Sequence, residues 1–465
     1  MKRKLLTYWL CAITGLAHAQ VPNAQKDTTE ITYGTASGDV KVPFEGMNLT
    51  WINGQSRIKE SPLVLTDKNG ETILTGTAYM DAYYNYNFAN PNDNTQTISS
   101  AIGRHNETSI NLASFGIESY YKNCIGRLWL QYGSMQHIVQ ELDASVNRGR
   151  NTGTGNLKFI REAAAGYHFN KWHGINIEAG IFMSYIGLES YMLQDNWSYQ
   201  RSMVCDFTPF YFQGARVQMF PSKKLKQEIW VLNGWQTYNS YSKSPGLGSS
   251  TYWRPNENIQ LVANFYLGRD TQNPDTAGNQ SNRIRFHHDN SVVARYFTKP
   301  ESKGISQAAF SLNTHYGFQK GTDKGDNITA KEHFMIGTSL ANRIWFNKNK
   351  FALTLRGDVV SNGGNYLAFS PSPVTPNDYT DAFASNANKP IQIFQGTVTF
   401  DIMPNDYVTF RFEYGHRNSN IPYFTGPAGT TSPSGWVNGP ATVNAWRPDL
   451  GRSEDRVTVA VNFRL

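Results

Sequence analysis

Long apolar runs and cysteine are both scarce in this sequence. No segment beyond the N-terminal region approaches the roughly 18 consecutive apolar residues of a membrane-spanning helix, so a helical membrane protein is not expected. Only three of the 465 residues are cysteine. Cys124 and Cys205 are expected to be free thiols, because an exported chain of this size does not need a disulfide. Lys and Arg are scattered without a basic block, so nucleic acid is not indicated as a partner.

The first 19 residues have the pattern of a secretory signal peptide. Basic residues at 2–4 precede an apolar run over 5–16, and Ala17-His18-Ala19 provides a small-residue cleavage site. Cys11 does not indicate a lipid anchor, because Leu10 precedes it where a small residue would be expected. We therefore predict an exported chain with a formal charge of +4, since the signal peptide supplies three of the seven net positive charges.

Glycine and aromatic residues are abundant instead. The chain has 39 Gly and 25 Tyr, and its aromatic share of 13 % is high beside a charged share of 17 %. This composition fits many short strands, tight turns and aromatic belts at membrane interfaces. The mean hydropathy of −0.49 would ordinarily indicate a soluble protein. A membrane barrel gives a similar value, because only every second residue of its strands faces lipid.

Alternation of apolar and polar residues recurs along the chain. In the last eleven residues Val457, Val459 and Val461 alternate with polar or small residues, and this period of two predicts a β-strand. Sixteen such segments are predicted, and most reach the roughly 9–11 residues that a tilted membrane strand needs. They cover 74–86, 109–121, 124–134, 157–168, 174–183, 208–220, 225–235, 245–254, 257–268, 283–297, 305–318, 331–346, 350–361, 391–403, 407–418 and 453–465.

The connections between these segments alternate between long and short. Eight long connections and seven short turns form the pattern of an outer-membrane barrel, with long extracellular loops and short periplasmic turns. The apolar last strand is not an exposed edge in such a fold, because it pairs with the first strand. We therefore predict an all-β fold, a closed antiparallel transmembrane β-barrel of about 16 strands (roughly 14–18).

The barrel is predicted to occupy residues 74–465 and to follow a periplasmic N-terminal extension, residues 20–73. The extension contains "ITYGTASGDV" and "EGMNLTWING", which are poorly periodic. It is too short for the plug domain of a siderophore transporter. It either projects into the periplasm or tucks into the barrel mouth, and the sequence leaves both arrangements open.

The most specific stretch of the sequence covers residues 179–219. It reads "AGIFMSYIGLESYMLQDNWSYQRSMVCDFTPFYFQGARVQM" and is followed by "WVLNGWQ". Earlier and later stretches add to it, namely "LTGTAYMDAYYNYNF", "RHNETSINLASFGIE" and "YWRPNENIQLVANFYLG". Together they resemble the OmpL-like putative β-barrel porin family of Gram-negative outer membranes, over most of residues 74–300. The resemblance implies a porin-like channel for passive diffusion of small hydrophilic solutes, surrounded by outer-membrane lipid, with no cofactor and no catalytic chemistry.

The third long loop, residues 184–207, is the candidate pore constriction. It carries Glu189, Asp195 and Arg201, together with aromatic residues such as Trp197. If the loop folds inward, its opposed charges would set a field across an aqueous lumen, and its rings would offer a stacking surface for sugars. The alternative is that Trp197 and Arg201 only hold the loop against the barrel wall.

Charged residues on the polar faces of the strands predict the lining of the lumen. The lumen-facing residues are Arg127, Glu178, Arg216, Arg356, Asp358, Arg411, Glu413, Arg456 and Arg464. Six are basic and three are acidic, which suggests a weak preference for anions. The alternative is a set of bracing ion pairs, such as Arg356 with Asp358 and Arg411 with Glu413, that leaves little net selectivity.

An enzyme and a metal site are both disfavoured by the placement of histidine. An outer-membrane hydrolase needs a nucleophile beside a histidine at the barrel rim. His105, His137 and His416 lie in loops or at the rim, and none has a recognisable nucleophile motif beside it. His287 and His288 are adjacent on one strand and point to opposite faces, which weakens a metal interpretation. We predict no enzymatic activity and no metal.

Two properties stay open at the level of sequence. A non-conducting barrel that presents its long loops for adhesion or assembly is the alternative to a channel. A homotrimer is common among porins of this size, and the lipid-facing aromatic residues would look the same in a monomer.

Overall fold

The structure is a computed structural model of the full chain. It describes residues 43–59, 61–99, 102–141, 143, 154–240, 242, 244–269, 282–323, 326–364, 366–367, 390–430 and 449–465. The predicted signal peptide and residues 20–42 of the predicted extension lie outside the described residues.

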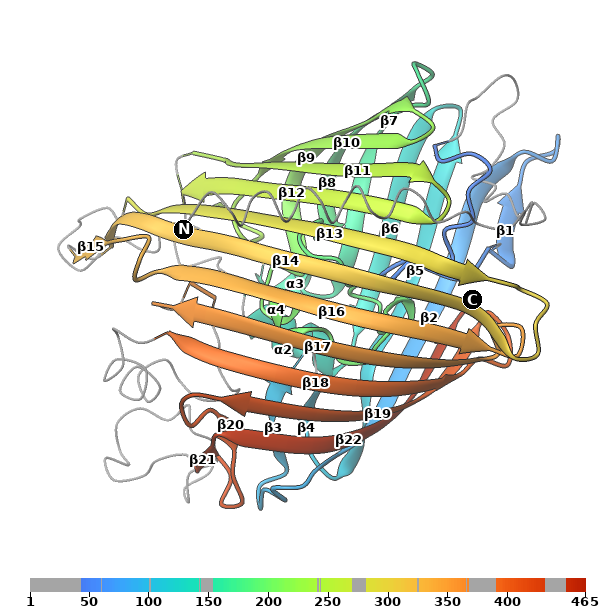
Figure 1. Ribbon diagram of the computed structural model, residues 1–465. Helices are drawn as coiled ribbons and strands as arrows, with labels where there is room; N and C mark the ends of the chain where they lie inside the picture. The colour runs from blue at the N-terminus through green and yellow to red at the C-terminus, as the bar shows by residue number, and fades with distance from the viewer. Residues whose placement is uncertain are drawn as a thin grey trace, which may run out of the picture.

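Sixteen antiparallel strands of the described chain form a closed barrel (Figure 1). They are β2 (Thr72–Asn87), β5 (Glu107–Tyr121), β6 (Cys124–Tyr132), β7 (Ile160–Phe169), β8 (Ile175–Met183), β9 (Tyr211–Ser222), β10 (Leu225–Leu232), β11 (Gly246–Asn256), β12 (Ile259–Arg269), β13 (Ile284–Thr298), β14 (Ile305–Asp323), β16 (Phe334–Phe346), β17 (Phe351–Gly363), β18 (Ile391–Ile402), β19 (Val408–Ser419) and β22 (Ser453–Arg464). Each pairs with its neighbour in chain order, and β22 closes the ring against β2, for example through Val461 and Ala82. The predicted fold class and the strand count are confirmed.

Short elements decorate the ends and the interior of the barrel. They are β1 (Leu63–Thr66), β3 (Thr95–Ser99), β4 (Ile102–Arg104), α2 (Ser134–Glu141), α3 (Thr154–Leu157), the 3-10 turn η2 (Leu193–Asp195), α4 (Met203–Asp206), β15 (Asp326–Ile328), β20 (Phe424–Thr425) and β21 (Leu450–Gly451). Within the described residues, no helix combines the length and the apolar character needed to cross a membrane.

The seven tight turns all lie at one end of the barrel, called here the short-turn end. They are 122–123, 170–174, 223–224, 257–258, 299–304, 347–350 and 403–407. Lys122 and Asn123 have φ of +49° and +67°, the left-handed pair of a two-residue hairpin turn. The opposite, long-loop end carries β15 and β21 and is seen on the left of Figure 1. The predicted alternation of long and short connections is therefore present.

The outer face of the strands is mostly apolar and the inner face is mostly polar, as expected for a barrel in lipid. Along β18, Phe394, Val398 and Phe400 are exposed on the outer face, while Thr397 and Thr399 are buried inside. Exposed aromatic residues lie near both ends of the wall; they include Phe88, Tyr132, Phe169, Trp172 and Trp253. An apolar band between two aromatic belts is the surface of a membrane-embedded barrel.

The packed core lies inside the ring. Three clusters of buried apolar side chains combine inward-facing wall residues with residues of the connections at the long-loop end, such as Met135, Tyr366 and Tyr423, and of two longer segments. One segment is the β8–β9 connection, residues 184–210, called here the inward loop. The other is residues 43–59, called here the strap. A barrel of this size would otherwise enclose a wide aqueous lumen, so these segments determine what remains of it.

Candidate functional site

The inward loop runs down the interior of the barrel from the long-loop end. Most of its side chains are buried, including Trp197 at 4 % exposure and Tyr199 at 0 %. Burying an irregular backbone requires partners for its N–H and C=O groups. The wall formed by β16, β17, β18, β19 and β22, called here the anchor wall, supplies many of these partners through charged side chains.

Arg411 binds the part of the inward loop that lies nearest the short-turn end, residues 193–196. Its guanidinium donates hydrogen bonds to the carbonyl oxygens of Leu193 (2.5 Å) and Asn196, and it forms an ion pair with Asp401 at 3.0 Å. Arg343 also pairs with Asp401, at 2.7 Å, and donates to the carbonyl of Trp197 at 2.9 Å. Because a guanidinium carries five donors, one residue can neutralise a carboxylate and satisfy the loop backbone together.

A second anchor lies midway along the loop, around Arg356. Its guanidinium pairs with Asp358 at 3.1 Å and with Glu189 of the loop at 3.2 Å, and it donates to the carbonyl of Gln200 at 2.5 Å. The Glu189 carboxylate in turn accepts hydrogen bonds from the backbone and the hydroxyl of Ser202. The predicted Arg356–Asp358 pair therefore exists, and it fastens the loop to the wall.

Glu413 and Asp195 complete the attachment. Glu413 accepts hydrogen bonds from the backbone N–H groups of Tyr199 (2.7 Å) and Gln200 (3.0 Å). Asp195 forms a two-point ion pair with Arg464, both distances being 3.1 Å. Glu413 thus binds the backbone of the loop instead of pairing with Arg411. The residue directly opposite Arg411 on the neighbouring strand is Asp401.

The strap meets the inward loop from the short-turn end. The backbone N–H of Gly54 donates to the carbonyl of Asp195 at 3.0 Å. Asn53 accepts from the backbone of Trp197 at 2.9 Å, and the Trp197 indole donates to the carbonyl of Trp51 at 3.1 Å. The two segments therefore form one hydrogen-bonded unit inside the barrel.

The two ends of the strap are held on different parts of the wall. At one end the Arg254 guanidinium lies 3.9 Å from the centre of the Phe44 ring. At the other end Arg57 donates to the carbonyls of Asp406 (2.9 Å) and Val408 (2.6 Å), next to the β18–β19 turn. The strap therefore crosses the interior near the short-turn end. A segment this irregular has no periodic signal, which is why the sequence left its position open.

On the inner face of strands β6 to β10, the basic side chains are less covered than those of the anchor wall, whereas Phe182, Phe212 and Trp230, which lie nearer the long-loop end, are buried. The Arg127, Lys226 and Arg216 side chains retain 19 %, 17 % and 12 % exposure, whereas Arg343, Arg356 and Arg411 on the anchor wall retain 4 % or less. The basic groups here are linked through buried acids. Glu178 pairs with both Arg127 and Arg216, and Glu228 pairs with Lys226 at 3.2 Å.

The structure thus gives most of the predicted residues an anchoring contact. Glu189, Asp195 and Trp197 contact the anchor wall or the strap, and the Arg201 guanidinium lies 4.6 Å from the centre of the Phe210 ring. Arg456 is buried on the inner face, 3.9 Å from Glu454. Sequence reasoning missed Arg343, Asp401, Arg417 and Glu454, although all four lie at inward positions of predicted strands and could have been found from the same alternation.

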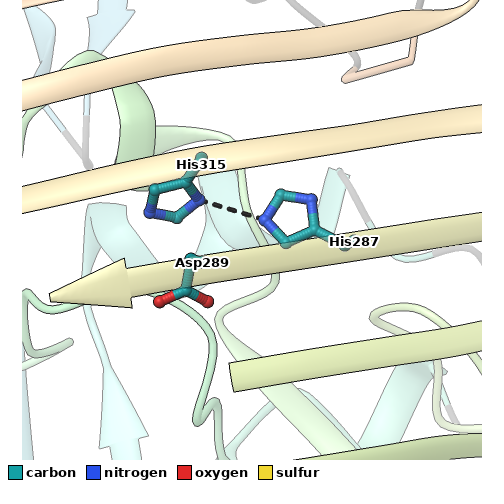
Figure 2. A group of neighbouring side chains, drawn as sticks. All are labelled: His287, Asp289 and His315. Carbon is teal, nitrogen blue, oxygen red and sulfur yellow. Dashed lines mark hydrogen bonds between the residues drawn. The ribbon is translucent and has the colours of Figure 1, made fainter. Parts of the chain in front are cut away.

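Three metal-ligand side chains gather behind the inward loop: His287 and Asp289 from β13 and His315 from β14 (Figure 2). All three are buried, and within the described part of the chain they form the one such group of three or more His, Cys, Asp or Glu residues. His288 points to the outer face, as the sequence indicated. His315 was missed because its proximity depends on strand register, which places it directly opposite Asp289.

The two cysteines of the described chain differ sharply in environment. Cys124 is exposed, whereas Cys205 is buried in α4. Burial, together with the nearby Glu189 carboxylate, raises the pKa of the Cys205 thiol to about 12. The Cys205 thiol therefore stays protonated at about pH 8, and only the thiolate is the nucleophile.

We expect N-ethylmaleimide at pH 8 to modify Cys124 alone in the folded protein and both cysteines after denaturation. Intact-mass spectrometry measures the number of adducts. The C124S variant is the control and should take up no label until it is unfolded. Rapid labelling of folded C124S would show that the inward loop leaves the interior in solution.

Comparisons with known proteins agree with the geometry. The family model described as "Putative beta-barrel porin-2, OmpL-like" matches residues 73–452. No curated protein matches the sequence. Among solved structures, the outer membrane channel DcaP of Acinetobacter baumannii has a TM-score of 0.50 at 12 % identity, covering 87 % of this chain and 100 % of that one. An anion-selective porin from Comamonas acidovorans has a TM-score of 0.49 at 9 % identity, covering 84 % of this chain and 99 % of that one. At 12 % identity the likeness to the DcaP channel is one of fold.

Proposed function

This chain belongs to the OmpL-like putative β-barrel porin-2 family of the bacterial outer membrane, and from that premise we propose that it is a channel for passive diffusion of small hydrophilic solutes. The observation that carries the proposal is the difference in exposure between the basic side chains of the two walls. The anchor wall is covered by the inward loop, whereas basic side chains on β6 to β10 remain partly exposed. Solutes would pass along these partly exposed basic side chains, between the loop and the wall.

A weak preference for anions is the finer part of the proposal. Arg127, Lys226 and Arg216 present their charged groups to the proposed path. Their acidic partners Glu178 and Glu228 are more deeply buried, and Glu162, which lies 3.5 Å from Arg127, is 14 % exposed. A unit charge about 8 Å from an ion in water contributes about 0.5 kcal/mol, which salt at about 0.15 M screens to about 0.2 kcal/mol. The contribution has opposite signs for an anion and a cation, so one such residue changes the anion-to-cation permeability ratio roughly twofold. The excess of exposed basic groups over acidic groups along this path is small, so the expected selectivity for anions is also small.

The proposed channel also has a defined orientation in the outer membrane and a surface that is compatible with a homotrimer. The long-loop end faces the cell exterior and the short turns face the periplasm, as in other barrels of this membrane. Lipid contacts the outer face, a homotrimer is compatible with that surface, and neither a cofactor nor catalysis is required.

Single-channel recording in planar bilayers tests this function. We expect steady conductance steps and a reversal potential in a salt gradient that slightly favours anions. The R127Q variant should shift the permeability ratio toward cations by about twofold, because it removes one lining charge. Glu178 retains its pair with Arg216 in this variant, so folding should be preserved.

The matched control is R104Q, which removes a basic residue that β4 carries in the β2–β5 connection, outside the barrel wall. It should leave the permeability ratio unchanged. Equal shifts in both variants would contradict the proposed path. A folded barrel without any conductance would overturn the channel and favour loops used for adhesion or assembly.

A further inference from the structure

The group formed by His287, Asp289 and His315 has the arrangement of a metal site with its outer partners already in place. Nε2 of His287 lies 3.0 Å from Nδ1 of His315, and Figure 2 shows the two rings meeting through these nitrogens. One donor atom from each of the three residues lies within 4.8 Å of the others. What the two nitrogens carry can be worked out from the partners of the opposite ring nitrogens.

The proton on His287 is fixed by Tyr366. The Tyr366 hydroxyl donates to the backbone carbonyl of Phe286 at 2.9 Å, and a carbonyl can only accept. The same hydroxyl lies 2.9 Å from Nδ1 of His287, so it accepts the Nδ1–H of that ring. Arg285 holds the tyrosine in place by donating to its carbonyl at 2.8 Å. A neutral His287 therefore presents a lone pair at Nε2.

The proton on His315 is fixed by Asn313. The Asn313 amide nitrogen donates to the carbonyl of Asn290 and to the hydroxyl of Ser291, both at 3.0 Å. The amide oxygen therefore faces Nε2 of His315, 2.8 Å away, and accepts its N–H. It also accepts from the Cys205 thiol at 3.2 Å. A neutral His315 therefore presents its lone pair at Nδ1, directly toward the lone pair of His287.

Two facing lone pairs at 3.0 Å repel each other unless a cation lies between them. A shared proton would join the two rings and leave Asp289 without a bond to either, whereas a metal ion can bond to all three residues. Ligand atoms on a tetrahedral zinc ion lie about 3.4 Å apart, so the side chains need to move by at most about 1.5 Å. Oriented outer hydrogen bonds of this kind are the usual partners of metal-binding histidines.

We propose that His287, Asp289 and His315 bind a divalent transition metal of the zinc class, and that this ion fastens the inward loop to strands β13 and β14. The donor set of two imidazoles and one carboxylate suits zinc and its neighbours. The link to the loop runs through Asp289, which accepts the backbone N–H of Gly187 at 3.2 Å. Asn264 holds the other carboxylate oxygen at 2.9 Å. The three ligands are buried, with exposures of 0–2 %, so the ion would be shielded from solvent.

Metal analysis of the purified full-length barrel, refolded with Zn²⁺ and then desalted, tests the site. We expect about one zinc ion per chain in the wild type and background levels in H287Q and H315Q. Refolding with Co²⁺ should give a visible absorption band that both variants lack. The matched control is H288Q, which changes the adjacent residue on the outer face of the same strand and should retain the metal.

Y366F keeps all three ligands and removes one hydroxyl, which accepts from His287 and donates to the carbonyl of Phe286, so it provides a variant that is expected to fold. Its affinity for zinc, measured by competition with a chelator, should fall by about 10–100-fold. Background zinc in the folded wild type would overturn the proposal and leave a proton shared between the two rings. Zinc at wild-type levels in both H287Q and H315Q would show that the metal binds elsewhere.

Discussion

Replacing Gly54 by alanine is expected to detach the strap from the inward loop and to raise single-channel conductance by about twofold or more, because the segments that narrow the lumen set conduction. Gly54 has a φ of +83°, and a Cβ at this position would lie 2.2 Å from the carbonyl oxygen of Leu188 and 3.4 Å from the nitrogen of Ser190. Both atoms belong to the inward loop backbone, which is bonded to the anchor wall on its other side. The strap is therefore the part that must move.

Gly46 provides the matched control for this substitution. It has a similar φ of +71°, but a Cβ there would meet nothing within 4 Å. G46A and G54A therefore share the cost of a left-handed alanine, roughly 1–2 kcal/mol, and only G54A adds the collision. We expect G46A to conduct like the wild type. If both variants conduct alike in bilayers, the strap does not narrow the path, and its contacts with Asp195 and Trp197 serve stability alone.

The barrel itself could be predicted from the sequence because its determinants are local. Period-two alternation needs only neighbouring residues, and it placed the last strand at 453–465, where the structure has β22 at Ser453–Arg464. The predicted segment 245–254 is likewise present as β11 (Gly246–Asn256). The same alternation assigned Arg356, Asp358 and Arg411 to the inner face, since orientation follows from position within a strand.

The interior could not be predicted in the same way because its contacts join distant residues. The hydrogen bond from Trp51 to the carbonyl of Glu257 spans 206 positions, and those from Arg57 to the β18–β19 turn span about 350. No periodic pattern records such contacts. The predicted Arg411–Glu413 pair was wrong for a related reason. Arg411 forms its ion pair with Asp401, which lies directly opposite on the neighbouring strand, and not with a residue two positions away on its own strand.

Substituting Arg411 by methionine is expected to have the largest effect on stability. The variant loses the hydrogen bonds to the carbonyls of Leu193 and Asn196 and one of the two cations around Asp401. Removing one member of a buried charge network costs about 3–5 kcal/mol, because the groups left behind stay desolvated. Guanidinium chloride unfolding of the barrel in lipid vesicles measures the loss. The lower part of the loop should also become accessible to protease.

R104M is the control for the Arg411 substitution. The Arg104–Glu107 pair has side chains 39 % and 37 % exposed, and ion pairs that water surrounds contribute about 1 kcal/mol or less. We expect R104M to unfold within about 1 kcal/mol of the wild type. A loss of similar size in both variants would contradict the assignment of Arg411 as the main anchor of the loop.

Combining R411M with G54A shows whether the wall and the strap hold the loop together or separately. Arg411 bonds to the carbonyls on either side of Asp195, and Gly54 bonds to the carbonyl of Asp195 itself. Because both act on the same turn, the double variant should depart from additivity by about 0.5–3 kcal/mol. Once Arg411 is lost, the loop can yield to the alanine, so the second substitution should cost less than it does alone. Strict additivity would mean that the loop is held at two independent points and that the lumen can be opened from either end.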